Sequence, residues 1–190
     1  MVSRHWRDVI LDNPIFWTTI DLLAMSPSVI KTHLKRSGKS LLDIVIEIDG
    51  SPSSHSTRLD TSMRIVMPHV YRWRTLDVFE TGVYYYNSDE DPLTVVEFLE
   101  EAIHGLEFPS LKRASISCSL STVHPSFLSP TGALLLEKLV LNDCQAWKDF
   151  APPPTLKTLK LSFESIVDPR YTPLSYSNSN IDNALTLRDD

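Results

Sequence analysis

The chain has 190 residues, of which 42% are hydrophobic and 22% are charged, as in an ordinary globular domain. Its formal net charge is −6, so it lacks the surplus of Lys and Arg that neutralises phosphates in nucleic-acid-binding proteins. Arg58, Arg64, Arg72 and Arg74 could still form a local basic patch that binds nucleic acid. The charge balance instead favours a solvated surface at these residues. The short apolar runs and the charged N-terminus predict no membrane span and no signal peptide, so we expect a cytoplasmic or nuclear protein.

Residue types that carry enzyme chemistry are scattered along the chain. The five glycines form no phosphate-binding loop, and the six histidines show no HExxH-like spacing. Cys118 and Cys144 are too few for a disulfide framework or a metal cage, and we interpret them as unreactive thiols. We therefore expect no catalytic residue, no metal site and no cofactor. The alternative, an unrecognised hydrolase, would require a pocket lined by a carboxylate and a histidine.

The first part of the chain predicts alternating helices and strands. A serine N-cap predicts a helix over residues 3–11, and Pro14 opens a further turn after that helix ends. The β-branched residues of 18–22 predict a strand. The pair Ser26-Pro27 then begins a second helix that ends at Gly38. Its expected buried face consists of Val29, Ile30, His33 and Leu34.

The same alternation continues to the end of the chain. Period-two apolar residues predict a strand over 42–48, residues 50–54 are typical of a loop, and helical segments follow over 57–69 and 92–104. The further expected strands are 73–79, 111–117, 136–141 and 156–163. The polar stretch from Ser175 onward predicts a flexible end.

An apolar-x-x-apolar-x-apolar pattern occurs five times, beginning at Leu41, Trp73, Leu111, Leu136 and Leu156. The shorter intervals between these starts lie in the leucine-rich-repeat range of about 20–29 residues, and the longer ones contain the expected helices. Cys144 follows the fourth copy where such repeats carry Asn or Cys. The pattern predicts an α/β leucine-rich-repeat-like solenoid, with a parallel sheet on its concave side and helices on its convex side. A generic α/β layer fold is the alternative.

The repeat makes a prediction about the sheet and about its exposed face. Strands beginning near 42, 76, 112, 137 and 157 should be neighbours, in chain order, in one parallel sheet. Side chains between the apolar positions should then form a polar strip that recognises a protein. Its expected residues are Asp43, Val45, Thr75, Asp77, Ser115, Lys157 and Lys160. Tyr84, Tyr85 and Tyr86 are either an aromatic anchor of the same surface or a strand edge and loop.

The N-terminal segment carries a second pattern: Trp6-Arg7-Asp8 in a helix, then Pro14, then Phe16-Trp17 before a strand. This spacing resembles the second half of the F-box motif. The helix and apolar strand that follow are similar to those of F-box proteins of the fungal (basidiomycete) type. In that family the motif begins with an earlier Leu-Pro-x-Glu-like helix, so the N-terminal half of the F-box is missing from this sequence.

The resemblance implies a substrate-recruiting subunit of a cullin-RING ubiquitin ligase, which docks onto a Skp-family adaptor and presents a protein substrate. The implied docking residues are Trp6, Arg7, Val9, Ile10, Pro14 and Trp17. Together with the repeats it implies a partial F-box over 1–24, a repeat array over 25–172 and a tail over 173–190. One alternative is a repeat scaffold or truncated paralogue without ligase docking. In another, Trp6, Phe16 and Trp17 simply pack into the core.

Overall fold

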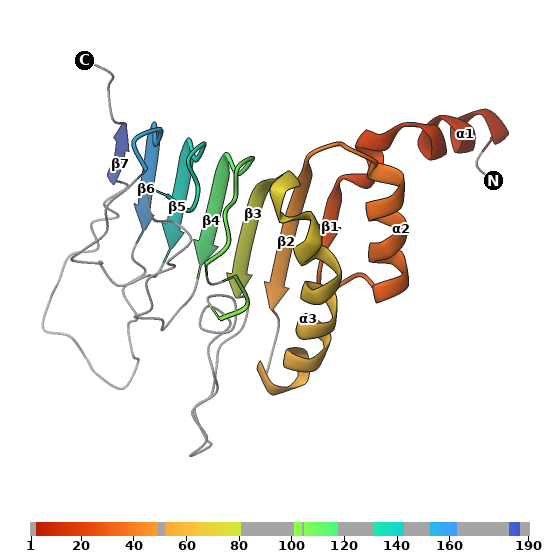
Figure 1. Ribbon diagram of the computed structural model, residues 1–190, viewed down its shortest axis with the longest axis horizontal. Coiled ribbons are helices and arrows are strands. Elements are labelled where there is room, and N and C mark those ends of the chain that lie inside the picture. Colours follow the sequence, from red (N-terminus) through yellow and green to blue (C-terminus); the bar gives the residue numbers. More distant parts are fainter. Residues whose placement is uncertain are drawn as a thin grey trace, which may run out of the picture.

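The computed structural model describes residues 3–48, 52–80, 101–103, 105–117, 131–142, 153–162 and 183–186. In chain order, the elements are α1 (Arg4–Asp12), η1 (Pro14–Trp17), β1 (Thr19–Asp21), α2 (Pro27–Ser37), β2 (Leu42–Ile48), α3 (Pro52–Val66), η2 (Met67–Arg72), β3 (Trp73–Glu80), β4 (Arg113–Ser117), β5 (Lys138–Asn142), β6 (Thr158–Ser162) and β7 (Asn183–Thr186). They define an α/β fold in which α2 and α3 lie on one face of a single sheet (Figure 1).

The sheet contains the strands in chain order, β1-β2-β3-β4-β5-β6-β7. Strands β1 to β6 are parallel, and β7 pairs antiparallel with β6. The prediction that the repeated strands are ordered neighbours in one parallel sheet is therefore confirmed for β2 to β6. It follows that the repeated apolar positions lie side by side across the sheet, as the register of the strands requires.

Local signals explain most of the helix ends. The Ser3 hydroxyl accepts a hydrogen bond from the Trp6 backbone N–H at 3.3 Å, and Gly38, with φ of 57°, ends α2 in a conformation that favours glycine. Two expectations are wrong. The helix expected from residue 57 already begins at Pro52, because a proline is well suited to the first helical turn. Val29 is 41% exposed rather than buried, because only Ile30, Leu34 and Ser37 of α2 face the core.

The hydrophobic core lies on one face of the sheet, and α2 and α3 cover it at the β1 to β3 end (Figure 1). Ile20, Ile44, Leu76, Ala114 and Leu139 occupy one row across five neighbouring strands, and all are fully buried. Helix side chains that pack into the same core are Ile30, Leu34, Leu59, Met63 and Val66. Trp73, at the start of β3, is also fully buried, with its ring centroid 5.6 Å from that of Phe108.

The same tight turn lies immediately before each of the strands β3 to β6, and we call each turn with its strand a unit. The carbonyls of Phe108, Ala133 and Pro153 accept hydrogen bonds from the N–H groups three residues later, at 3.2, 3.1 and 3.0 Å. The Trp73 N–H makes the same contact with the Val70 carbonyl before β3. Each of these turns therefore ends on a buried residue of the repeated apolar pattern: Trp73, Leu111, Leu136 or Leu156.

The two edges of the sheet differ from the regular parallel strands between them. Thr18 and Leu22 bond to β2, so the alternate residues Thr19 and Asp21 direct their backbone groups away from it. The Thr19 carbonyl accepts a hydrogen bond from His33 Nδ1 at 3.1 Å, and the Asp21 carbonyl accepts one from the Met25 N–H at 3.2 Å. At the other edge β7 pairs with β6, which places a strand inside the segment expected to be a flexible tail.

None of the helices in the described segments is both long enough and apolar enough to span a membrane.

Candidate functional site

One face of the sheet is uncovered by any helix in the described residues, and the strand register arranges its side chains in rows. The first row is Asp43, Thr75, Arg113, Lys138 and Thr158. The second is Val45, Asp77, Ser115, Val140 and Lys160. We call these two rows the open face. The structure thus brings together six of the residues expected on the partner surface. Lys157 is not in these rows, because it immediately precedes the first residue of β6.

Charge on the open face is separated along the sheet. The acidic side chains are on β2 and β3, where Asp43 and Asp77 are half-buried and Glu47 is exposed. The basic side chains Arg113, Lys138 and Lys160 are on β4, β5 and β6, and all are exposed. Arg74 of β3 already pairs with Asp43, so a partner that matched this surface would mainly carry acidic groups over β4 to β6, where the exposed cations lie.

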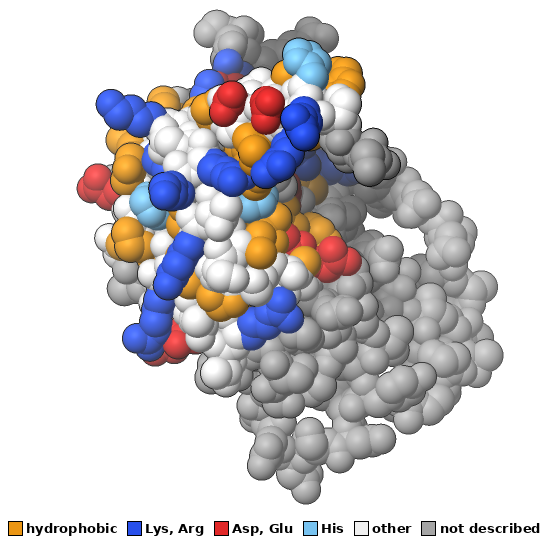
Figure 2. Space-filling model, turned by 90° about the vertical axis from the view of Figure 1, so that its right-hand side faces the viewer, with side chains coloured by type: hydrophobic (Ala, Val, Ile, Leu, Met, Phe, Trp, Pro, Cys, Tyr) orange, Lys and Arg blue, Asp and Glu red, His pale blue; other side chains and the backbone are white. Residues whose placement is uncertain are grey.

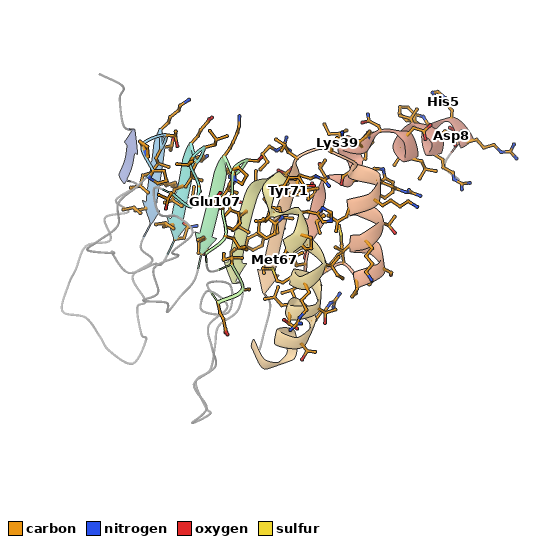
Figure 3. All side chains as sticks on the ribbon, in the orientation of Figure 1. His5, Asp8, Lys39, Met67, Tyr71 and Glu107 are labelled. Atoms are coloured by element: carbon orange, nitrogen blue, oxygen red, sulfur yellow. The ribbon has the colours of Figure 1, made fainter. Side chains whose placement is uncertain are left out.

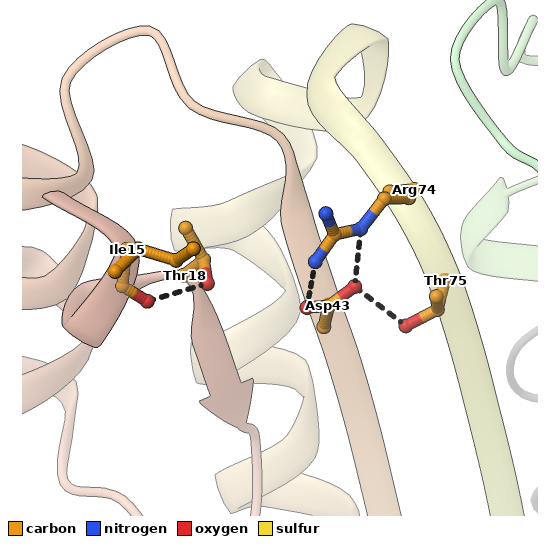
Figure 4. Close-up of polar contacts among 5 residues, drawn as sticks. All are labelled: Ile15, Thr18, Asp43, Arg74 and Thr75. Carbon is orange, nitrogen blue, oxygen red and sulfur yellow. Dashed lines mark hydrogen bonds and ion pairs between the residues drawn. The ribbon is translucent and has the colours of Figure 1, made fainter.

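Asp43 is held by a local network at the acidic end (Figure 4). Arg74 donates two hydrogen bonds to its carboxylate, from Nε at 3.0 Å and from an Nη at 2.6 Å, and the Thr75 hydroxyl donates a third at 3.0 Å. A register shift between Leu42 and Asp43 makes Arg74 an extra residue in β3, which lets it lie against the neighbouring strand. The paired guanidinium fixes the carboxylate in one orientation.

Asp77 has a more distant cationic partner than Asp43 has. Its Oδ1 atom is buried without a hydrogen bond among the described residues, and the closest cation is Arg113, with an Nη at 3.6 Å. Burial raises the pKa of Asp77, the Arg113 charge opposes that rise, and the Asp43 charge adds to it. Because this carboxylate is partly buried and has no close partner, its ionised form lowers the stability of the fold.

This arrangement predicts how stability depends on pH. Because the pKa of Asp77 is higher in the folded than in the unfolded chain, its contribution to stability is lost as pH rises from the ordinary aspartate range through the folded pKa. We expect Asp77→Asn to have a larger free energy of unfolding than the wild type at pH 7. The gain should shrink as the pH is lowered into the ordinary aspartate range, as measured by urea denaturation.

A matched control is Asp60→Asn on α3, where Asp60 forms an exposed ion pair with Arg64 at 2.9 Å. We expect it to change stability by less than about 0.5 kcal/mol at either pH. An Asp77→Asn protein that is no more stable than the wild type at pH 7 would show that burial does not penalise the charge.

The N-terminal elements form a second surface, which we call the head: α1 together with η1. No residue of α1 is buried, and Figure 3 shows α1, with His5 and Asp8 labelled, extending away from the sheet. The large apolar side chains exposed here are Trp6 (62%), Val9 (36%), Ile10 (39%), Ile15 (64%) and Phe16 (54%). Core packing is therefore wrong for Trp6 and Phe16. Arg7 and Pro14 of the expected docking set are also exposed.

Trp17 differs from the other aromatic residues of the head because it packs inward. Its indole N–H donates to the Ile10 carbonyl at 2.9 Å, its ring lies edge-on to His33 at 5.1 Å between centroids, and Arg36 covers it at 4.3 Å. These contacts attach the head to α2. Figure 2 views this end of the molecule, where Lys and Arg side chains are interspersed with hydrophobic ones.

Several functional candidates fall outside the described residues: Tyr84, Tyr85, Tyr86, Cys118 and Cys144. Within the described part of the chain, no three His, Cys, Asp or Glu side chains are grouped as metal ligands. Sequence reasoning missed the exposed Leu134 and Leu135 and the exposed Tyr71, which lie in the turns before β5 and β3. The signal for Leu134 and Leu135 was a run of apolar residues longer than the repeat needs, Leu134-Leu135-Leu136.

Searches against protein-family models, curated proteins and solved structures find no match to this chain.

Proposed function

We propose that the protein is a non-enzymatic recognition module of the F-box type, which docks onto a Skp-family adaptor through its head and recruits a protein substrate to a cullin-RING ubiquitin ligase. In this proposal the parallel units form an irregular leucine-rich-repeat-like solenoid, and the open face is its concave, substrate-binding side. Both parts agree with the resemblance of the N-terminal segment to the F-box motif and with the repeated apolar pattern.

The observation that carries the docking part is the exposure of the head. Trp6, Val9 and Ile10 share one side of α1, and Ile15 and Phe16 are exposed in the adjoining η1. Several large apolar side chains open to water on adjoining elements are typical of a surface that binds a protein. Aromatic residues of this kind are also the ones that contribute most to interfaces.

The support for a solenoid is the repetition of one local geometry. Each strand from β3 to β6 is preceded by the same turn, and in the last three units the residue after the turn bonds back to its counterpart in the previous unit. Lys112 N–H donates to the Arg74 carbonyl, Glu137 N–H to the Lys112 carbonyl and Lys157 N–H to the Glu137 carbonyl, each at 2.9 Å. Repeats that contact mainly their neighbours in this way are typical of solenoids.

Adaptor docking predicts a result for a paired substitution. We expect Trp6→Ala with Ile10→Ala to weaken binding to a purified Skp-family adaptor by about tenfold or more, measured by titration calorimetry. The fold should persist, because both side chains are exposed. Val29→Ala removes a similarly exposed apolar side chain from α2 and should leave the affinity unchanged. Failure of the wild-type chain to bind any such adaptor would remove the docking half of the proposal.

The arrangement of Trp17 favours a second candidate, a repeat scaffold without ligase docking. Its ring is already engaged by Ile10, His33 and Arg36, so one of the expected docking residues serves intramolecular packing. In that case the open face alone would bind a partner, and titration calorimetry with the adaptor would give no signal.

A further inference from the structure

The turns before β3 to β6 carry apolar side chains that the core does not use. Tyr71, Leu134 and Leu135 are 54%, 57% and 47% exposed, and Pro109 and Pro154 are exposed at equivalent places in their own turns. We call these five residues the turn ridge. It is separate from the open face, because it lies at the N-terminal ends of the strands, the upper ends of β3 to β6 in Figure 1.

Hydrogen bonds between units hold the turns next to one another. The Ser110 hydroxyl donates to the Tyr71 carbonyl at 2.7 Å, joining the turns before β4 and β3. The Thr155 hydroxyl lies 2.9 Å from the Leu134 carbonyl and 3.0 Å from the Leu136 carbonyl, joining the turns before β6 and β5. The backbone bond from Glu137 to Lys112 connects the middle pair. The ridge is therefore one continuous row in the structure.

The spacing of the row indicates the shape of what could lie along it. Neighbouring strands are about 4.8 Å apart, so the four turns span about 14 Å. One face of an α-helix presents side chains about every 5.4 Å, which differs from the row by about 2 Å over this length. An extended peptide presents same-side residues about every 6.7 Å and falls out of step by about 6 Å. A helix matches the ridge, and an extended strand does not.

The charges beside the ridge indicate which helix would fit. Lys112, Lys138 and Lys157 are exposed in the residues that follow the turns. The nearby acidic side chains are Glu137, which also follows a turn, and Glu107, which lies just before the turn that precedes β4. The ion pairs among them are long: 3.9 Å from Lys112 to Glu137 and 4.0 Å from Lys157 to Glu137. One carboxylate shared loosely between two ammonium groups leaves a net positive border along an apolar row.

We propose that the turn ridge binds an amphipathic helix of a partner protein, with the apolar face of that helix on Leu134, Leu135 and Tyr71 and its acidic residues toward Lys112, Lys138 and Lys157. Recognition of a helix through an apolar row with complementary charges at its border is an established mode of protein binding. The five residues of the ridge belong neither to the head nor to the open face, but its charged border shares Lys138 with the open face.

The test uses the full chain and a labelled, stapled helix of about 18 residues, with Leu at i, i+3, i+4 and i+7 and Glu beside them. We expect saturable binding by fluorescence anisotropy, and no binding of the same helix with Lys in place of Glu. Leu134→Ser with Leu135→Ser should weaken binding about tenfold. Val29→Ser, at an exposed apolar position of α2, is the control and should not weaken it.

A second variant keeps the test valid if the serine substitutions disturb the turn. Lys112→Glu with Lys157→Glu should lower the affinity for the acidic helix about tenfold and allow the Lys-containing helix to bind. Equal binding of both helices, or no binding of either, would overturn the proposal. It would also be overturned if the wild type dimerises in sedimentation and the Leu134→Ser, Leu135→Ser variant is monomeric, because the ridge would then be an interface between copies.

Discussion

Trp73→Ala is expected to lower the free energy of unfolding by about 3–5 kcal/mol, the largest loss that we predict for a single substitution in this chain. Trp73 is fully buried, starts β3 and packs against Phe108 and the neighbouring core. Removing its ring leaves a cavity where the helices, the turn before β3 and the next unit meet. Urea denaturation followed by far-UV circular dichroism measures the loss, and a change below about 1 kcal/mol would show that this position is not central to the core.

Trp73→Phe separates packing from the polar atom of the indole. The Trp73 N–H is buried without a hydrogen-bond partner among the described residues, which is itself unfavourable. Phenylalanine keeps an aromatic contact with Phe108 and removes that N–H. We therefore expect a loss of no more than about 2 kcal/mol, because relief of the unpaired donor offsets part of the smaller cavity.

Arg72→Met is expected to give the second large effect, a loss of about 2–3 kcal/mol. Arg72 is only 5% exposed; its Nε donates to the Ser40 carbonyl at 2.9 Å and an Nη to the Ser37 hydroxyl at 2.8 Å. These bonds join the end of η2 to the last residue of α2 and to the segment that follows it. Methionine keeps the aliphatic stem but leaves the Ser40 carbonyl without that partner, and the unfolding midpoint in urea should fall accordingly.

Arg58→Met is the matched control, because Arg58 also donates to a backbone carbonyl, that of Ala24, but at 3.3 Å and on the surface. We expect a change of less than about 0.5 kcal/mol for it. A double-mutant cycle of Arg72→Met with Ser37→Ala should give a coupling energy of about 1 kcal/mol. A coupling near zero would mean that the Ser37 contact does not stabilise the fold.

Much of the sheet could be predicted from the sequence, because its signals are local. Apolar residues at period two place β2 at 42–48, and the repeated pattern places the later strands within a few residues. The order of the strands follows from the repetition itself, since equivalent units stack on their neighbours. The Ser3 cap and Gly38 are likewise set by backbone groups within one turn of the chain.

The remaining features depend on distant contacts. Periodicity placed both Val29 and Ile30 on the inner face of α2, and only packing against β1 and α3 decides that Ile30 is buried and Val29 is not. The inward position of Trp17 depends on His33 and Arg36, which belong to another helix. The polar residues around β7 predict no strand. The strand forms because β6 offers an unpaired edge with which it can pair.

The candidate surfaces could be predicted in part. Alternation within each strand identified Asp43, Asp77 and Lys160 as outward-facing, but the separation of acidic from basic residues needs the register between strands. The turn ridge needs more, because its residues are far apart in sequence and only the stacking of equivalent turns makes them neighbours.

The two edge strands of the sheet bear on how such a protein can lengthen. His33 and Met25 occupy the outward carbonyls of β1, and β7 reverses the strand direction beyond β6. Neither edge strand therefore continues the regular parallel ladder of the strands between them. A further parallel strand fits more directly among β2 to β5, where every strand already has a parallel neighbour on both sides.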